Sequence, residues 1–407
     1  MTTILSALLR VLLYGTLAAA IVFAGHYLIV EKRHEPAAVS TETRPMETPP
    51  VSEMASSGPE PVPAPAVAPH EIAKAVEDDS SLARRAKASL DAGDYKTALV
   101  LCKQLAETQK KASLCVGLSY FKLADYAGAI TYLEKALESG EDEFTARKYL
   151  SFAYYYRDNF DQSMSNAERG RAIMKDPELE AFYSRLTKEK QAHRNYVNES
   201  SGHFRVQSDG YEHGAMSRKV IGMLEEAYAT TGRDLDYYPS EPITVVLYTT
   251  HDFHDITQAP GWSGGLFDRK DGKIRVPVRG AEGQDALLRT VLSHEYVHAL
   301  IHSITKSCPL WLHEGMAEYY SKGPSQRIGQ VIPLGTLENS FSGLNGRGIF
   351  IAYAESHSAV SYLMDRYRPY RIKELLNSLS KGNDLNTAFK DSVQISYTEF
   401  IEKWGRK

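Results

Sequence analysis

The chain has 407 residues, 43% of them hydrophobic and 24% charged, so it is long enough for two folded domains that each bury a core. A formal net charge of −4 gives no electrostatic case for binding nucleic acid, and we exclude that class of function. Three cysteines are too few and too scattered for a disulfide scaffold or a cysteine zinc site.

The first element in chain order is a run of 20 residues, 11–30, without Asp, Glu, Lys or Arg. An apolar helix of this length spans a bilayer, and no small-x-small cleavage site follows it. We therefore expect an uncleaved transmembrane helix within a membrane anchor at 1–34. Basic residues flank both ends of the run, so the charge count leaves its sidedness open.

Residues 35–70 contain nine of the chain's 18 prolines, mixed with Ala, Ser, Glu and Thr, and show no apolar periodicity. Such a stretch buries too little apolar area to offset the entropy of ordering it. We predict a disordered, Pro-rich linker that holds the folded part away from the membrane.

Residues 80–195 carry a recurring pattern of helical hairpins. An Asp-Tyr pair ending at Tyr95 returns at Tyr126, an offset of 31 residues, and a weaker copy begins at Arg157. Periods of about 34 residues with small residues at helix contacts resemble tetratricopeptide repeats, and about three hairpins suffice for a continuous core. Two roles stay open: a groove for a protein partner, or a spacer that braces the next domain.

Two of the cysteines, Cys102 and Cys115, fall on adjacent helices of this pattern. A disulfide between them is conceivable outside the cytoplasm. We favour instead the interpretation that they pack as small apolar side chains.

From about residue 200 the pattern changes to mixed strand and helix, which predicts a second domain at 200–407. The β-rich runs 203–207 and 243–248 flank an amphipathic helix. An Asp-Gly turn at 271–272 between apolar runs is typical of a hairpin. Pro277 in its second arm places that arm at a sheet edge.

The pattern that carries chemistry is His294-Glu-Tyr-Val-His298, an H-E-x-x-H sequence inside a helix expected over 285–303. Residues four apart lie on one face of a helix, so both imidazoles can reach one cation. Glu295 then sits beside them, close to a metal-bound water. The pattern alone is suggestive only.

A second helix is expected after Pro309, with the sequence Trp311-Leu-His-Glu-Gly-Met-Ala-Glu318. Two imidazoles and the carboxylate of Glu314 leave a fourth position open for water, which is the ligand count of a catalytic zinc site. Glu318, one turn further along, can accept the second ring proton of a ligating histidine. The alternative for Glu318 is a solvated carboxylate.

Residues 200–405 resemble the thermolysin-like gluzincins, and more closely the peptidase MA-like domains that are fused to tetratricopeptide repeats in bacterial proteins. The resemblance rests on the segments 294–298 and 311–317, with support from 224–228, 259–265 and 397–404. It implies one zinc ion per chain, held by His294, His298 and Glu314. His313 departs from the Asn of aminopeptidase relatives, and we expect it to point away from the metal.

The resemblance also implies how the site would act. Glu295 would be the general base that takes a proton from zinc-activated water and passes it to the leaving amine of a peptide or protein substrate. Tyr353 or His357 would stabilise the oxyanion, with helix packing as the alternative for either. As in the related fold, the predicted edge strand, with Ile274, Arg275 and Val276, would bind an extended substrate through main-chain hydrogen bonds.

The predicted fold class is therefore multidomain: an N-terminal transmembrane helix, all-α tetratricopeptide-like repeats, and an α+β zincin-like metallopeptidase domain. The predicted location is the bacterial inner membrane, as a single-pass protein with its folded domains on the periplasmic side. The alternative function is a repeat-containing adaptor or scaffold with a non-catalytic peptidase-like domain. A metallohydrolase that acts on a non-peptide amide also stays open.

Overall fold

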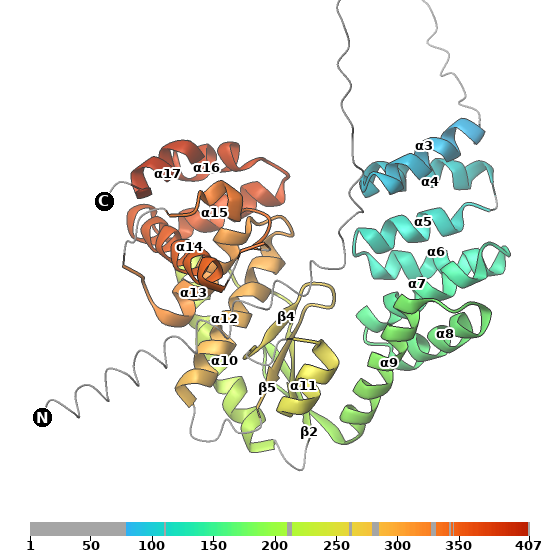
Figure 1. Cartoon of the computed structure of the whole chain (residues 1–407), viewed down its shortest axis with the longest axis horizontal. Helices are drawn as coiled ribbons and strands as arrows, with labels where there is room; N and C mark the ends of the chain where they lie inside the picture. Colours follow the sequence, from blue (N-terminus) through green and yellow to red (C-terminus); the bar gives the residue numbers. More distant parts are fainter. Residues whose placement is uncertain are drawn as a thin grey trace, which may run out of the picture. The chain divides into compact units, whose positions relative to one another are not determined.

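The structure of the chain is a computed structural model (Figure 1). It describes residues 79–109, 111–209, 214–259, 263–278, 285–326, 331–341, 343–344 and 346–405. The segments for which the sequence predicts a membrane anchor, 1–34, and a Pro-rich linker, 35–70, lie outside the described residues.

No helix in the described part of the chain is long and apolar enough to cross a membrane. The longest described helices, α10 (Gly214–Leu235), α12 (Asp285–Ile304) and α14 (Gly346–Tyr367), carry charged side chains along their length, and charge inside a bilayer is costly. The transmembrane helix of the predicted fold class and the predicted location as a single-pass membrane protein are therefore not borne out in the described part of the chain. The structure is a helical fold with one small sheet.

The chain divides into two compact units, and residues 34–141 form one of them. Its described helices pack in consecutive pairs and are α3 (Asp79–Asp91), α4 (Tyr95–Thr108), α5 (Ser113–Lys122) and α6 (Tyr126–Glu138). Asp94 and Asp125 immediately precede α4 and α6, and each carboxylate accepts a hydrogen bond from a backbone N–H of the first turn. This preferred helix N-cap explains the recurring Asp-Tyr pair: the aspartate caps the helix that the tyrosine begins.

A disulfide joins Cys102 of α4 to Cys115 of α5. Cys102 belongs to the buried apolar cluster of this unit, which includes Leu101, Leu105 and Val116, and the half-buried Cys115 packs against that cluster. The favoured interpretation of these cysteines as two packed apolar side chains is therefore wrong, because the sulfur atoms are bonded to each other.

The described part of the other unit begins at residue 142 and runs to residue 405. It begins with α7 (Glu143–Tyr156), α8 (Phe160–Ile173), α9 (Pro177–Ala192) and the short η1 (His193–Asn195). The segment 80–195, predicted as one repeat domain, is thus divided between the two units. The tetratricopeptide assignment and the predicted domain boundaries stay predictions.

The described strands form one five-stranded sheet in the order β1-β2-β3-β5-β4. The strands are β1 (Tyr196–Ser200), β2 (Phe204–Asp209), β3 (Ile243–Tyr248), β4 (Leu266–Asp268) and β5 (Lys273–Pro277). β2 pairs parallel with β3, and β3 pairs parallel with β5. At the two ends of the sheet, β1 pairs antiparallel with β2 and β4 pairs antiparallel with β5. The two edge strands are therefore β1 and β4.

Side chains alternate between the two faces of this sheet. On one face, residues such as Leu247 and Ile274 belong to the large core under α10 and α12. On the other, residues such as Val246 and Tyr248 pack with α11 (Thr250–Thr257) and the end of α9.

The C-terminal helices complete the unit and are α13 (Leu310–Lys322), α14, α15 (Pro369–Ser380), α16 (Leu385–Val393) and α17 (Tyr397–Gly405), with η2 (Leu334–Leu337) between α13 and α14. α13 packs against both α12 and α14.

The strand that carries Ile274, Arg275 and Val276 is not at the edge of the sheet. β5 lies between β3 and β4, so Ile274 and Arg275 have ladder partners on both sides, and all three side chains are buried. These residues cannot receive an added substrate strand, and the edge-strand prediction is wrong. Pro277 is tolerated because it ends β5 at a point that the short β4 does not reach.

Candidate metal centre

Two histidines and one glutamate from consecutive helices converge inside the second unit. His294 and His298 lie one turn apart on α12, and Glu314 lies on α13. One ligand atom from each of the three lies within 4.8 Å of the other two. The Nε2 atoms of both histidines are 3.6 Å from Oε2 of Glu314. The sequence placed these three side chains together, and the structure does so as well.

The packing of α13 explains how Glu314 reaches the histidines. Pro309 is the N-cap of the helix, and Trp311 in its first turn is fully buried in the core against Phe400 and Tyr397 of α17. With the start of α13 held in this way, one helical turn brings Glu314 to face α12.

The donor set fits a divalent cation. All three residues are at most 4% exposed, and burial of an uncompensated carboxylate is costly. Burial, followed by repulsion from Glu318, raises the pKa of Glu314 to about 8, and burial lowers the pKa of His294 to about 4. A cation among two imidazole nitrogens and a carboxylate oxygen would compensate the buried charge, and these are ligand types of catalytic zinc sites.

Glu318 lies beside the other ring nitrogen of His294. Its Oε1 is 3.6 Å from Nδ1 of His294, and its Oε2 is 2.6 Å from Nζ of Lys322. The side chain is buried and not solvated. A distance of 3.6 Å is longer than a hydrogen bond, but it places the carboxylate beside the ring nitrogen through which a ligating histidine is oriented.

Glu295 is held by the edge strand β4. Its Oε2 accepts a hydrogen bond of 2.7 Å from the backbone N–H of Phe267. Burial, and secondarily the nearby Glu314, raise the pKa of Glu295 to about 8. The carboxyl also packs on Gly265, where a Cβ atom would stand 2.9 Å from its Cγ. Gly265 belongs to the segment 259–265 that supports the family resemblance, but no pattern assigned a contact with Glu295 to Gly265 or Phe267, because both contacts depend on tertiary packing.

The two candidates for an oxyanion donor lie at different places. Tyr353 on α14 donates a hydrogen bond to Glu314 and so touches the ligand set. His357, one turn further, donates from Nε2 to the carbonyl oxygen of Gly323 at 2.7 Å, and its Nδ1 is 4.0 Å from Glu318. Tyr353 is therefore at the site itself, while His357 contacts the residues around it.

His313 does not point away from the cluster as expected. Its ring stacks on that of His298, with centroids 4.4 Å apart and planes 9° apart, and it is buried. Burial, with Arg269 and His302 nearby, holds the pKa of His313 well below its usual value. Although adjacent to Glu314, His313 thus lies as a buried ring against one of the candidate ligands.

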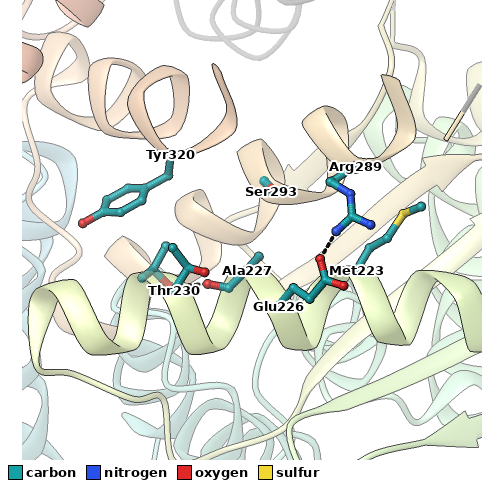
Figure 2. A pocket seen from close by; sticks show the side chains of 8 residues that line it. Met223, Glu226, Ala227, Thr230, Arg289, Ser293 and Tyr320 are labelled. Carbon is teal, nitrogen blue, oxygen red and sulfur yellow. Dashed lines mark hydrogen bonds and ion pairs between the residues drawn. The ribbon is translucent and has the colours of Figure 1, made fainter. Parts of the chain in front are cut away.

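A separate pocket opens on another face of α12 (Figure 2). It is lined by Met223, Glu226, Ala227, Thr230 and Thr231 of α10, by Arg289 and Ser293 of α12, and by Tyr320 of α13. Arg289 and Ser293 lie on one face of α12, and His294 and His298 lie on a different face. Arg289 pairs with Glu226 there, and no predicted site residue lines the pocket.

Residues 225–405 match the Peptidase MA superfamily. This part of the chain, from the middle of α10 to the end of α17, is therefore a Peptidase MA superfamily domain, and it contains His294, Glu295, His298 and Glu314. The helices before α10 lie outside the match, which gives no support for tetratricopeptide repeats. No curated protein matches the chain.

Proposed function

We propose that the domain at 200–407 is a zinc metallopeptidase of the gluzincin type, which hydrolyses peptide bonds of a peptide or protein substrate. One observation carries the proposal: the buried convergence of His294, His298 and Glu314, with the carboxyl of Glu295 beside it. The match of residues 225–405 to the Peptidase MA superfamily supports the same chemistry.

Each residue then has a distinct task. The zinc ion, when bound by His294, His298 and Glu314, supplies Lewis acidity to the scissile carbonyl and to water. Glu295 accepts a proton from the attacking water and returns it to the leaving amine, and its raised pKa suits both steps. Tyr353 donates its hydroxyl hydrogen to the developing oxyanion. Glu318 orients His294.

The adaptor alternative makes a different prediction for metal content. A non-catalytic scaffold has no need for two buried imidazoles around a buried carboxylate, and that arrangement costs stability when nothing compensates it. The observed cluster therefore favours the enzyme.

Metal analysis tests the proposal. The purified chain should contain about one zinc per molecule, lose its peptidase activity after dialysis against a chelator, and regain it with added zinc. His294→Ala should reduce the zinc content to background. His251→Ala, which alters an exposed histidine outside the cluster, should keep both zinc and activity. A chain that purifies without zinc and cleaves peptides equally well with chelator would contradict the proposal.

Gly265→Ala should disturb Glu295 without removing any functional group. The added Cβ would stand 2.9 Å from Cγ of Glu295 and 2.9 Å from Cγ1 of Val291, so the carboxyl must shift. We expect kcat to fall about tenfold while zinc content is kept, since a small misplacement of a catalytic group costs one to two orders of magnitude. The measurement is kcat with a peptide substrate. Gly202→Ala, in open space, is the control and should leave kcat unchanged.

A further inference from the structure

A buried network of charged and phenolic side chains lies on the face of the sheet opposite to α12. Its members are Tyr155 of α7, Arg185 and Glu189 of α9, and Asp268, Asp271 and Arg275 of the β4–β5 hairpin. Tyr155, Glu189 and Arg275 are each at most 2% exposed. Nothing in the proposed chemistry uses these groups, although burying so many charges is costly unless they serve a purpose or pair well.

Arg275 lies at the centre of the network and forms an ion pair within its own hairpin. Its Nη1 and Nη2 atoms lie 3.2 and 2.5 Å from the two carboxylate oxygens of Asp271, in the turn between β4 and β5. Its Nη1 is also 3.7 Å from Asp268 at the end of β4. A bidentate arginine-carboxylate pair is directional, so it fixes the hairpin turn relative to β5.

Tyr155 ties this arginine to the preceding helices. Its hydroxyl accepts hydrogen bonds from Nη2 of Arg275 at 3.1 Å and from Nη2 of Arg185 at 3.0 Å. The same hydroxyl donates to Glu189 at 2.8 Å. One phenol oxygen therefore connects α7, α9 and β5 inside the protein.

A second tie runs between Lys273 of β5 and Asp158, in the turn after α7. A third, longer contact joins Arg185 of α9 to Asp268 of β4 at 4.0 Å. The β4–β5 hairpin is thus attached to the helices before the sheet at Asp268, which ends β4, and at Lys273 and Arg275 of β5.

The opposite side of the same hairpin holds Glu295. The N–H of Phe267, in the middle of β4, donates to its carboxylate, and Gly265, immediately before β4, packs against its Cγ. β4 has only three residues, and among the described strands it pairs with β5 alone. A displacement of the hairpin on the network side must therefore move the backbone groups that position Glu295.

We propose that Tyr155 and Arg275 are positioning residues, through which helices α7–α9 hold the β4–β5 hairpin and thereby orient Glu295. The inference rests on the proposed peptidase function. It makes α7–α9, which precede the Peptidase MA match, part of the catalytic unit and not merely a docking module or spacer.

The test is Tyr155→Phe, which removes only the hydroxyl. We expect kcat to fall about tenfold, with KM and zinc content unchanged, and amide hydrogen exchange in 263–278 to become faster while exchange in α12 stays as in the wild type. Tyr183→Phe is the matched control, because its hydroxyl bonds to Glu168 on the surface of the helices, and it should change none of these values. Wild-type kcat and exchange in Tyr155→Phe would overturn the inference.

Two further measurements separate positioning from general bracing. In a Glu295→Gln background, Tyr155→Phe should have no further effect on residual activity, because the residue that it positions no longer acts; an equal tenfold loss there would overturn the inference. If Tyr155→Phe fails to fold, Asp158→Asn removes the negative charge from the tie to Lys273 and should lower kcat about threefold, with an unchanged kcat overturning the inference. A wild-type chain without zinc or peptidase activity would instead contradict the proposed function.

Discussion

Replacing Glu295 with glutamine is expected to lower kcat for peptide hydrolysis about 10³-fold, which is within the usual contribution of a general acid–base group. The amide keeps the shape of the carboxyl and an oxygen that can still accept the hydrogen bond from Phe267, but it cannot take up a proton. Because burial already raises the pKa of Glu295 to about 8, a neutral side chain fits this position. Zinc content and melting temperature should therefore stay at wild-type values.

Glu355→Gln is the matched control for that experiment. Glu355 is also fully buried, on α14, but its carboxylate accepts hydrogen bonds from the backbone N–H groups of Val331 and Ile332 and does not face the cluster. Its glutamine variant should keep kcat within about threefold. If Glu295→Gln cleaves peptides at the wild-type rate, Glu295 is not the base and the assigned mechanism fails. Measured kcat, zinc content and melting temperature for both variants decide this.

The part of the site that sequence could predict is the part that local geometry determines. His294 and His298 share a face because a helix repeats every 3.6 residues, so a five-residue pattern suffices to bring them together. Glu314 was placed by its motif and by family resemblance. Its approach to α12 depends on how Trp311 anchors the start of α13, which no local pattern specifies.

At the sheet edge, a valid rule about proline led to a wrong prediction for the position of β5. Pro277 lacks an N–H, and the rule confines proline to edges or strand ends. Along β5 successive N–H groups point to opposite neighbours, and Val278 donates to Tyr248 of β3, so position 277 faces the β4 side. β4 begins at Leu266, which pairs with Arg275, and therefore never reaches Pro277. The hairpin was predicted, but which of its two arms lies at the edge depends on the pairing of β5 with β3, which no local pattern specifies.

His313 illustrates a limit of helix periodicity. Adjacent helical residues point about 100° apart, which predicts that a neighbour of Glu314 faces away from the metal. The prediction treats α13 alone, but α12 packs closely enough that His298 presents an edge to Glu314 and a face to His313. Glu314 and His313 therefore contact two different sides of the His298 ring. The periodicity of α13 alone cannot predict such contacts, because they depend on how α12 packs against it.

Gly315→Ala is expected to destabilise the protein by about 3 kcal/mol and to weaken zinc binding, although alanine is the better helix former. The new Cβ would stand 2.3 Å from the backbone oxygen of Ser356 and 2.6 Å from Cγ2 of Val360, both on α14. A backbone atom cannot rotate aside, so α13 and α14 must separate, and overpacking of this kind costs about 1–3 kcal/mol or more. Glu314 is the preceding residue and must move with the helix.

A comparison with Gly222→Ala shows whether packing or helix propensity determines the change in stability. Gly222 lies inside α10 with nothing within 4 Å of the added Cβ, so alanine there should stabilise the protein by about 0.5–1 kcal/mol. The melting temperature should thus shift in opposite directions in the two variants, and only Gly315→Ala should weaken zinc binding in a zinc titration. If Gly315→Ala melts at or above the wild-type temperature, then α13 and α14 are not as close as described. The carboxylate of Glu314 would in that case owe its place beside His294 and His298 to something other than this helix contact.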